Sequence, residues 1–257
     1  RAIPPASGLL LAGMCCFAAS DALAKYLTTR MSVPEMVWFR YVFLVATIAP
    51  LVWREPALLR SRQPVFQVGR CLGTLSSALL FIAALGQMPL AEATAIAFAS
   101  PVFVTELSAL LLKEHVDRPR WLIVGVGFIG VLIVMQPGSA AFKPAAVLAV
   151  ASAMAWAMAV MFTRKVAETD SVTTTMSYTA LIGLITMSAV ALPSMRLPAW
   201  GDVPAIVAMG VAWCSAQWFV VSAYQRMNAS VLAPFAYSQL LFAALLGWAV
   251  FGAWPSG

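Results

Sequence analysis

Ionisable side chains inside apolar segments are the residues of this chain with the clearest capacity for chemistry. Asp21 and Lys25 lie in the first such segment and Arg40 lies in the second. Asp21 and Lys25 are four residues apart, so on one helix they would face each other, and the simplest interpretation is a pair that neutralises itself. Alternatively, Asp21 takes up a proton, or the pair orients a zwitterionic ligand. Arg40 needs a counter-ion, which Asp21 or Glu35 could provide.

Glu106 is the most isolated of these groups. It lies in an apolar segment, with no basic residue three or four positions away on either side. It must therefore find Arg40, Arg70 or another partner across helices, or stay protonated. A carboxyl group that changes its protonation state would suit a proton-coupled process, and a structural hydrogen bond would explain it equally well. Asp21, Lys25, Arg40 and Glu106 are accordingly candidates for ion pairs or for a coupling site.

The composition of the chain is typical of a membrane protein. It is 62% hydrophobic and 10% charged, whereas a soluble domain has about 25% charged residues. The net charge of +6 comes from Lys and Arg residues that are spread through short loops, so the expected partner is the lipid bilayer and not a nucleic acid. The four cysteines lie in apolar segments and the one histidine, His115, lies in a loop. No cofactor, metal site or disulfide framework is expected.

Nine apolar segments are candidates to cross a bilayer as helices, for which about 20 residues are needed. They lack the alternation of polar and apolar residues that a transmembrane barrel requires. The fifth is short and needs its flanks to span. The predicted fold class is an all-α integral membrane protein with spans at 7–27, 34–52, 68–87, 91–112, 121–136, 145–166, 172–192, 204–225 and 231–251.

The loop charges predict the orientation. With a cytoplasmic N-terminus, nine Lys and Arg residues fall in inner loops and three in outer loops. Cytoplasmic loops carry such an excess of positive charge. We therefore expect a multi-pass protein of the bacterial inner membrane with its N-terminus in the cytoplasm.

A fixed offset of 139 residues relates the two halves of the chain: residues 91–114 recur without gaps as residues 230–253. The offset holds from the first span to the last, which indicates a duplicated unit. Each unit has five spans, and an odd number inverts the second copy in the membrane. We expect residues 1–138 to form the first repeat, with five helices, and residues 139–257 the second, with four. A tenth helix would complete the ten-helix fold and is absent from this sequence.

Polar and aromatic residues at repeat-related positions are the candidates for a binding site, because an inverted repeat brings its two copies together around one cavity. Trp213 and Gln217 are added because they flank Ser215 and share a helix face. A buried amide needs a partner, so Gln217 and Gln239 should meet each other, water or a ligand. The alternative is that the polar groups only join helices, at about 0.6 kcal/mol each, and that the aromatic groups only pack. The candidates are Phe17, Ser76, Phe98, Ser100, Trp156, Trp213, Ser215, Gln217, Tyr237 and Gln239.

The chain resembles the EamA-type members of the drug/metabolite transporter superfamily. The resemblance is carried by the two five-helix repeats, by Pro101 with the LLLKE run at 110–114, and by the Gly-rich fifth span that ends VLIVMQPG at 131–138. The chain departs from the pattern at Ala253, which lies opposite Glu114, and at Phe17, where a tryptophan is common.

This resemblance implies a secondary transporter and not an enzyme. The expected cargo is a small metabolite, first an amino acid, aromatic or otherwise zwitterionic, that is exported by alternating access. Uptake of a vitamin or nucleoside-like metabolite, of the riboflavin or S-adenosylmethionine type, is the alternative. A membrane-embedded enzyme or a channel is less consistent with the residues, and a homodimer is left open.

Overall fold

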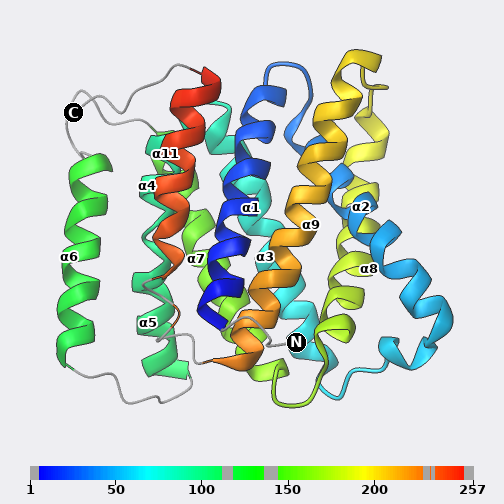
Figure 1. Ribbon diagram of the computed structural model, residues 1–257, viewed down its shortest axis with the longest axis horizontal. Coiled ribbons are helices and arrows are strands. Elements are labelled where there is room, and N and C mark those ends of the chain that lie inside the picture. Colours follow the sequence, from blue (N-terminus) through cyan, green and yellow to red (C-terminus); the bar gives the residue numbers. More distant parts are fainter. Residues whose placement is uncertain (1–5, 112–117, 136–143, 228–231, 233–234, 252–257) are drawn as a thin grey trace.

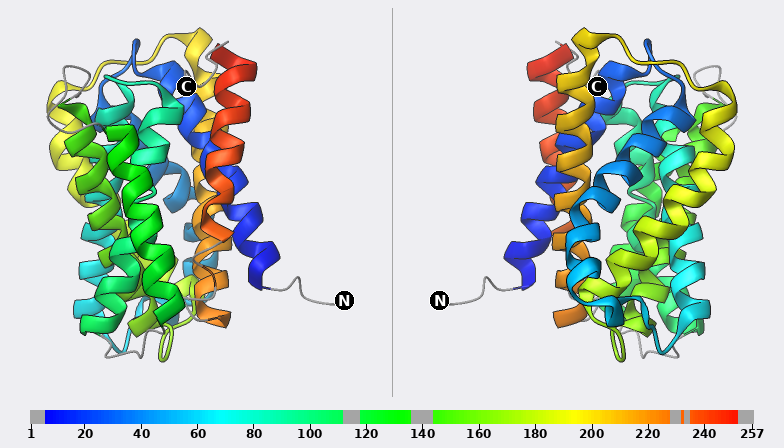
Figure 2. Two further views of the ribbon diagram at one scale, coloured as in Figure 1. Left: turned by 90° about the vertical axis from the view of Figure 1, so that its left-hand side faces the viewer. Right: turned by 90° about the vertical axis from the view of Figure 1, so that its right-hand side faces the viewer.

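The computed structural model describes residues 6–111, 118–135, 144–227, 232 and 235–251, and within these ranges the regular structure is entirely helical. The predictions that concern Glu114, His115 and Ala253, and the bend that Pro234 predicts in the ninth span, lie outside the described residues. Figure 1 shows the longer helices side by side along one common direction, and Figure 2 shows α1 tilted against the others. The main helices are α1 (Ala6–Leu27), α2 (Val33–Arg54), α3 (Pro64–Leu85), α4 (Leu90–Ala97), α5 (Ser100–Leu111), α6 (Arg118–Met135), α7 (Ala145–Val166), α8 (Val172–Ala191), α9 (Val203–Arg226) and α11 (Ser238–Phe251). Short 3-10 turns, η1 (Pro56–Leu59), η2 (Leu192–Ser194) and η3 (Trp200–Asp202), connect some of them.

Six of these helices are long and apolar enough to cross a membrane: α1, α2, α3, α7, α8 with η2, and η3 with α9. Large apolar side chains such as Leu72, Ile185 and Val211 are exposed on them. In water such a surface would be costly, whereas hydrocarbon accepts it. The chain is therefore a multi-pass, all-helical membrane protein.

Helix starts repeat along the chain at the offset that the sequence predicted. Helices α7, α8 and α9 begin 139 residues after α1, α2 and α3. The caps are also equivalent: Ser32 and Glu35 form a capping box at α2, and Ser171 accepts a hydrogen bond from the backbone N–H of Thr174 at α8. In Figure 1, α2 runs from top to bottom and α8 from bottom to top. Equivalent helices thus run in opposite directions.

The fourth predicted span is not one helix. α4 ends at Ala97 and α5 begins at Ser100. Pro101 explains the break, because it has no N–H to donate to the carbonyl of Ala97 and its ring would clash with that carbonyl in a continuous helix. The ninth predicted span is also interrupted: Leu232, Phe235 and Ala236 are helical, Tyr237 forms a turn, and α11 begins at Ser238.

Two glycines let α2 approach its neighbours closely. A Cβ atom on Gly183 of α8 would lie 2.1 Å from the Tyr41 ring, and one on Gly210 of α9 would lie 2.1 Å from the Phe43 ring. Small residues allow this kind of close packing between membrane helices. The Tyr41 ring is thereby held edge-on against Trp213, with ring centroids 5.2 Å apart.

Asp170 joins the loop between α7 and α8 to the loop before α3. Its carboxylate accepts hydrogen bonds from the hydroxyl of Ser61, from the backbone N–H of Arg62 at 3.0 Å and from Nε2 of Gln67 at 2.8 Å. Burial alone would raise the pKa of Asp170, but these hydrogen bonds outweigh it and hold the pKa below its ordinary value. The ionised form therefore stabilises this connection.

Two basic residues at repeat-related positions, Lys25 and Arg164, each contact the end of a neighbouring helix. Nζ of Lys25 donates to the carbonyls of Leu85, at 2.5 Å, and Met88, at 3.0 Å, at the end of α3. Nη1 of Arg164 donates to the carbonyl of Tyr224, at 3.4 Å, near the end of α9. Cations stabilise helix C-termini, where the carbonyls lack partners within the helix.

Candidate substrate-binding cavity

A cavity lies among α1, α3, α4, α7, α9 and α11. The volume available to the centres of water-sized spheres is about 110 Å³, which is room for several water molecules. Twelve of its lining residues form six pairs that are 139 residues apart: Met14 and Ala153, Phe17 and Trp156, Thr74 and Trp213, Ala78 and Gln217, Ala97 and Ala236, and Ser100 and Gln239. The cavity thus lies where equivalent positions of the two halves face each other.

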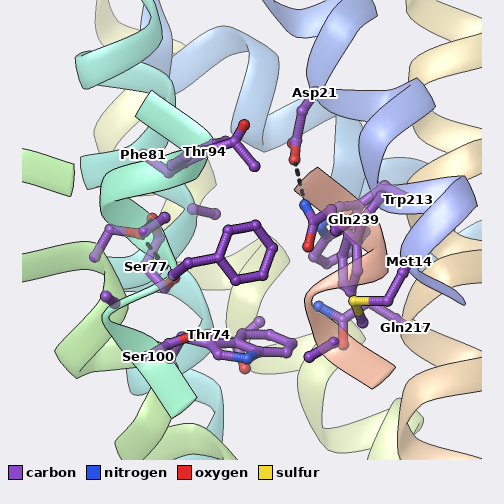
Figure 3. A pocket seen from close by; sticks show the side chains of 18 of the residues that line it. Met14, Asp21, Thr74, Ser77, Phe81, Thr94, Ser100, Trp213, Gln217 and Gln239 are labelled. Atoms are coloured by element: carbon purple, nitrogen blue, oxygen red, sulfur yellow. Dashed lines mark hydrogen bonds between the residues drawn. The ribbon is translucent and has the colours of Figure 1, made fainter. Parts of the chain in front are cut away.

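The two walls of the cavity differ in chemistry. Figure 3 shows Thr74, Ser77, Thr94 and Ser100 on one side, with hydroxyl groups. It shows Asp21, Gln217 and Gln239 on the other, with a carboxylate and two amides, together with the Trp213 ring. At five of the six repeat-related pairs at least one side chain is small or carries a hydroxyl, and the Phe17–Trp156 pair is the exception. The groups available for recognition are therefore not symmetric between the two halves.

Asp21 is bound by Arg40 and Gln239 and not by Lys25. Arg40 Nη2 lies 3.2 Å from Asp21 Oδ1, and Gln239 Nε2 lies 3.2 Å from Oδ2. Asp21 is 5% exposed and Arg40 is 2% exposed. The predicted Asp21–Lys25 pair is wrong, because Lys25 donates instead to the end of α3.

The other acidic candidates do not join this network. Glu35 accepts backbone N–H groups from Ser32, at 2.8 Å, and Arg196, at 2.7 Å, so Asp21 is the counter-ion of Arg40. Glu106 is half-buried, does not line the cavity and has no hydrogen bond or ion pair with another described residue. Its expected pairing with Arg40 or Arg70 is not found in the described part of the chain.

Gln217 is the cavity residue whose side chain has both of its polar atoms unpaired among the described residues. It is 1% exposed, and neither its amide nitrogen nor its amide oxygen has a partner among the described residues. A buried polar group in this state costs about 1–3 kcal/mol. The sequence predicted that Gln217 and Gln239 would meet each other, water or a ligand. Gln239 instead binds Asp21, and the prediction for Gln217 stays untested.

Aromatic rings meet in repeat-related pairs. Phe17 and Trp156 lie edge to face, with centroids 5.6 Å apart and planes at 90°. Phe98 and Tyr237 stack, with centroids 5.2 Å apart and planes at 26°. Tyr237 is not among the lining residues, but Phe98 is. The Phe17–Trp156 pair lies near the middle of α1 and α7. The Phe98–Tyr237 pair lies where the fourth and ninth spans are interrupted.

The predicted serine pair lies outside the cavity. Ser76 is exposed and Ser215 is half-buried, and neither lines it. Ser77 does, and its hydroxyl lies 3.1 Å from that of Ser152. The missed lining residues on α3 are Thr74, Ser77, Ala78 and Phe81. Their spacing of three, four and seven is that of one helix face, which was the available signal.

Among the described residues, no three His, Cys, Asp or Glu side chains gather into a possible metal site. The cavity offers hydrogen-bond donors and acceptors, aromatic surfaces and one buried ion pair. These groups can bind and orient a small molecule.

Known proteins resemble this chain along nearly its whole length. It is 25% identical to the S-adenosylmethionine uptake transporter of Rickettsia conorii, over 96% of this chain and 85% of that protein. It is 29% identical to the riboflavin transporter of Vibrio cholerae, over 97% and 85%, and 30% identical to the pseudopaline exporter CntI of Pseudomonas aeruginosa, over 94% and 87%. A solved crystal structure shares the fold with a TM-score of 0.74 at 21% identity, covering 98% of this chain and 91% of the other. The model of the EamA-like transporter family matches residues 5–136 and 143–257. The chain therefore belongs to the EamA-like transporter family.

Proposed function

We propose that this protein is a secondary transporter that carries a small metabolite with a flat aromatic body across the bacterial inner membrane. The observation that carries the proposal is a cavity built from repeat-related positions in a chain of the EamA-like transporter family. Sites in such transporters lie at the interface between inverted repeats, near the middle of the bilayer.

The cavity favours a cargo with an apolar ring and a polar end. Phe17, Phe98 and Trp156 offer aromatic surface, against which a flat ring packs well. Gln217 offers an unpaired amide. The only described carboxylate that lines the cavity, Asp21, is already neutralised by Arg40. This balance favours a cargo without net positive charge.

An aromatic amino acid is the first candidate that we test. Its ring fits the aromatic surfaces, and its ammonium and carboxylate groups can interact with the Asp21–Arg40 pair. A vitamin of the riboflavin type is the second candidate, because a related transporter at 29% identity carries riboflavin.

Transport would proceed by alternating access, with the halves moving around the cavity. The Lys25 and Arg164 contacts at the ends of α3 and α9 are equivalent in the two halves. The loop charges favour the N-terminus on the cytoplasmic side.

Counterflow in proteoliposomes tests the proposal. Vesicles loaded with unlabelled phenylalanine, tryptophan or riboflavin should accumulate the labelled compound transiently, and the rate should saturate. Trp156→Ala and Gln217→Ala should each reduce the initial rate at least tenfold, while Trp53→Ala, at a ring that is 90% exposed, should leave it unchanged. Full activity in both cavity variants would refute this site, and a rate that never saturates would indicate a channel.

A further inference from the structure

A buried arginine without a carboxylate partner lies close to the cavity. Arg70 of α3 is 2% exposed. Its Nε donates to the Thr163 hydroxyl at 2.9 Å, and its Nη1 donates to the Thr179 hydroxyl. Both hydroxyls donate their own hydrogen to a carbonyl of their own helix. No ion pair joins Arg70 to a carboxylate in the described part of the chain.

A full positive charge that is met only by neutral dipoles is costly in a protein interior. Inside membrane segments, charged side chains pair with opposite charges or mark the path of an ion or substrate. Arg40 follows the first pattern, because Asp21 neutralises it. Arg70 is left with its charge uncompensated by the described residues, so a negative ligand would stabilise it.

A small cavity adjoins Arg70 and shares part of its lining with the central cavity. Arg70 lines it together with Thr74, Trp156, Gln217 and Tyr224. The last four residues also line the central cavity. We call the small cavity the annex. Its volume for the centres of water-sized spheres is about 10 Å³, so it holds about one group the size of a water molecule.

Arg70, Thr74 and Gln217 are among the residues of the annex that carry hydrogen-bond donors. Arg70 supplies a guanidinium group, Thr74 supplies a hydroxyl, and Gln217 supplies an amide N–H₂. Thr74 is 2% exposed, and its hydroxyl has no partner among the described residues, as is also true of both amide atoms of Gln217. Figure 3 shows Thr74 and Gln217 on opposite walls of the central cavity, both lower in this view than Asp21. Arg70 has no acceptor atom to offer, so the annex is suited to an anion.

We propose that the annex binds a small monoanion through Arg70, Thr74 and Gln217. The anion is either a free halide or the carboxylate of a cargo held in the central cavity, of which one oxygen enters the annex. The annex is too small for a phosphate group with its own hydration. The first source rests on the proposed transport function and narrows the cargo to carboxylates, whereas the second does not depend on the cargo.

Thermal unfolding of the purified protein in detergent tests the site. Sodium isethionate is replaced stepwise by sodium chloride or by sodium acetate at constant ionic strength. A specific anion at several times its Kd should raise Tm by roughly 2–4 °C. The rise should be absent in Arg70→Gln and retained in Arg60→Gln, which removes an equal charge at an exposed position. A response of equal size in Arg70→Gln would overturn the proposal, as would the absence of any response in the unmodified protein to chloride, acetate and tryptophan.

Two further variants keep Arg70, so they test the site even if Arg70→Gln fails to fold. Thr74→Val and Gln217→Leu each remove one donor, and the concentration of anion needed for half of the rise in Tm should increase at least fivefold in each. An unchanged concentration in both variants would exclude the annex as the site.

The two anion sources are separated with a matched ligand pair. Tryptophan has the carboxylate and tryptophanamide lacks it. If the carboxylate of the cargo fills the annex, tryptophan raises Tm, chloride competes with it, and tryptophanamide has no effect. If a free halide fills it, chloride alone raises Tm and does not compete with cargo. An absent anion response would leave a positive counterflow result intact, and absent counterflow would leave the chloride response intact, so the two proposals fail separately.

Discussion

Breaking the buried Asp21–Arg40 pair should destabilise the protein far more than removing both of its charges. The two atoms in contact are 3.2 Å apart, which corresponds to an attraction of about 5 kcal/mol at an effective dielectric constant of about 20. Asp21→Asn removes this attraction and leaves Arg40 charged and buried. Single changes of this kind cost about 3–5 kcal/mol. The expected loss in Tm is therefore roughly 6–20 °C.

The double variant Asp21→Asn, Arg40→Gln should recover much of this loss, because neither charge is then left unpaired. Tm is measured in detergent for both single variants, the double variant and Glu168→Gln. Glu168 pairs with Lys165 at 3.9 Å on the surface, so its loss should cost about 0–1 kcal/mol. Additive losses from Asp21→Asn and Arg40→Gln would refute the reasoning that the pair is energetically coupled.

Three further predictions concern the fold. Gly183→Ala should cost about 1–3 kcal/mol, because its Cβ overlaps the Tyr41 ring, whereas Gly201→Ala, with no atom within 4 Å, should be neutral in the same Tm measurement. The contribution of Asp170 should be present above the ordinary aspartate pKa and should be lost as the pH falls through its lowered folded-state value; Asp170→Asn should flatten the acid side of a plot of Tm against pH, and an unchanged acid limb would contradict this. A cysteine at Arg60 should react with an impermeant maleimide in inside-out vesicles and not in intact spheroplasts, if the N-terminus is cytoplasmic; the opposite pattern would reverse the topology.

Much of the architecture could be predicted from the sequence, because it depends on local composition and on a constant offset. The helices α1, α2, α3, α7, α8 and α9 agree with predicted spans to within a few residues at most ends. The same offset identified the pairs Phe17–Trp156 and Phe98–Tyr237, which the structure brings into contact. Pro101 predicts a bend within the fourth span, because it removes a backbone hydrogen bond, and the structure has a break there, between α4 and α5.

The polar partners could not be predicted in the same way, because they depend on helix rotation and on contacts between distant segments. Ser76 and Ser77 differ by one residue, which turns a helix by about 100°, and only Ser77 faces the cavity. Asp21 binds Gln239, which is 218 residues away. The rule that residues four apart on a helix interact predicted Lys25 as the partner of Asp21, because this rule considers only residues of the same helix.

The interruption between α4 and α5 leaves a backbone carbonyl that needs a hydrogen-bond partner from protein, cargo or water. The Ala97 carbonyl has lost the donor that position 101 would supply in a continuous helix, and both Ala97 and Phe98 line the cavity. Hydrocarbon offers peptide groups no replacement, so irregular backbone at this depth is tolerated only beside protein or water. In the proposed transport cycle, a return step through a collapsed state without water would leave the Ala97 carbonyl without a hydrogen-bond partner. The return step should therefore carry either cargo or several waters through the bilayer.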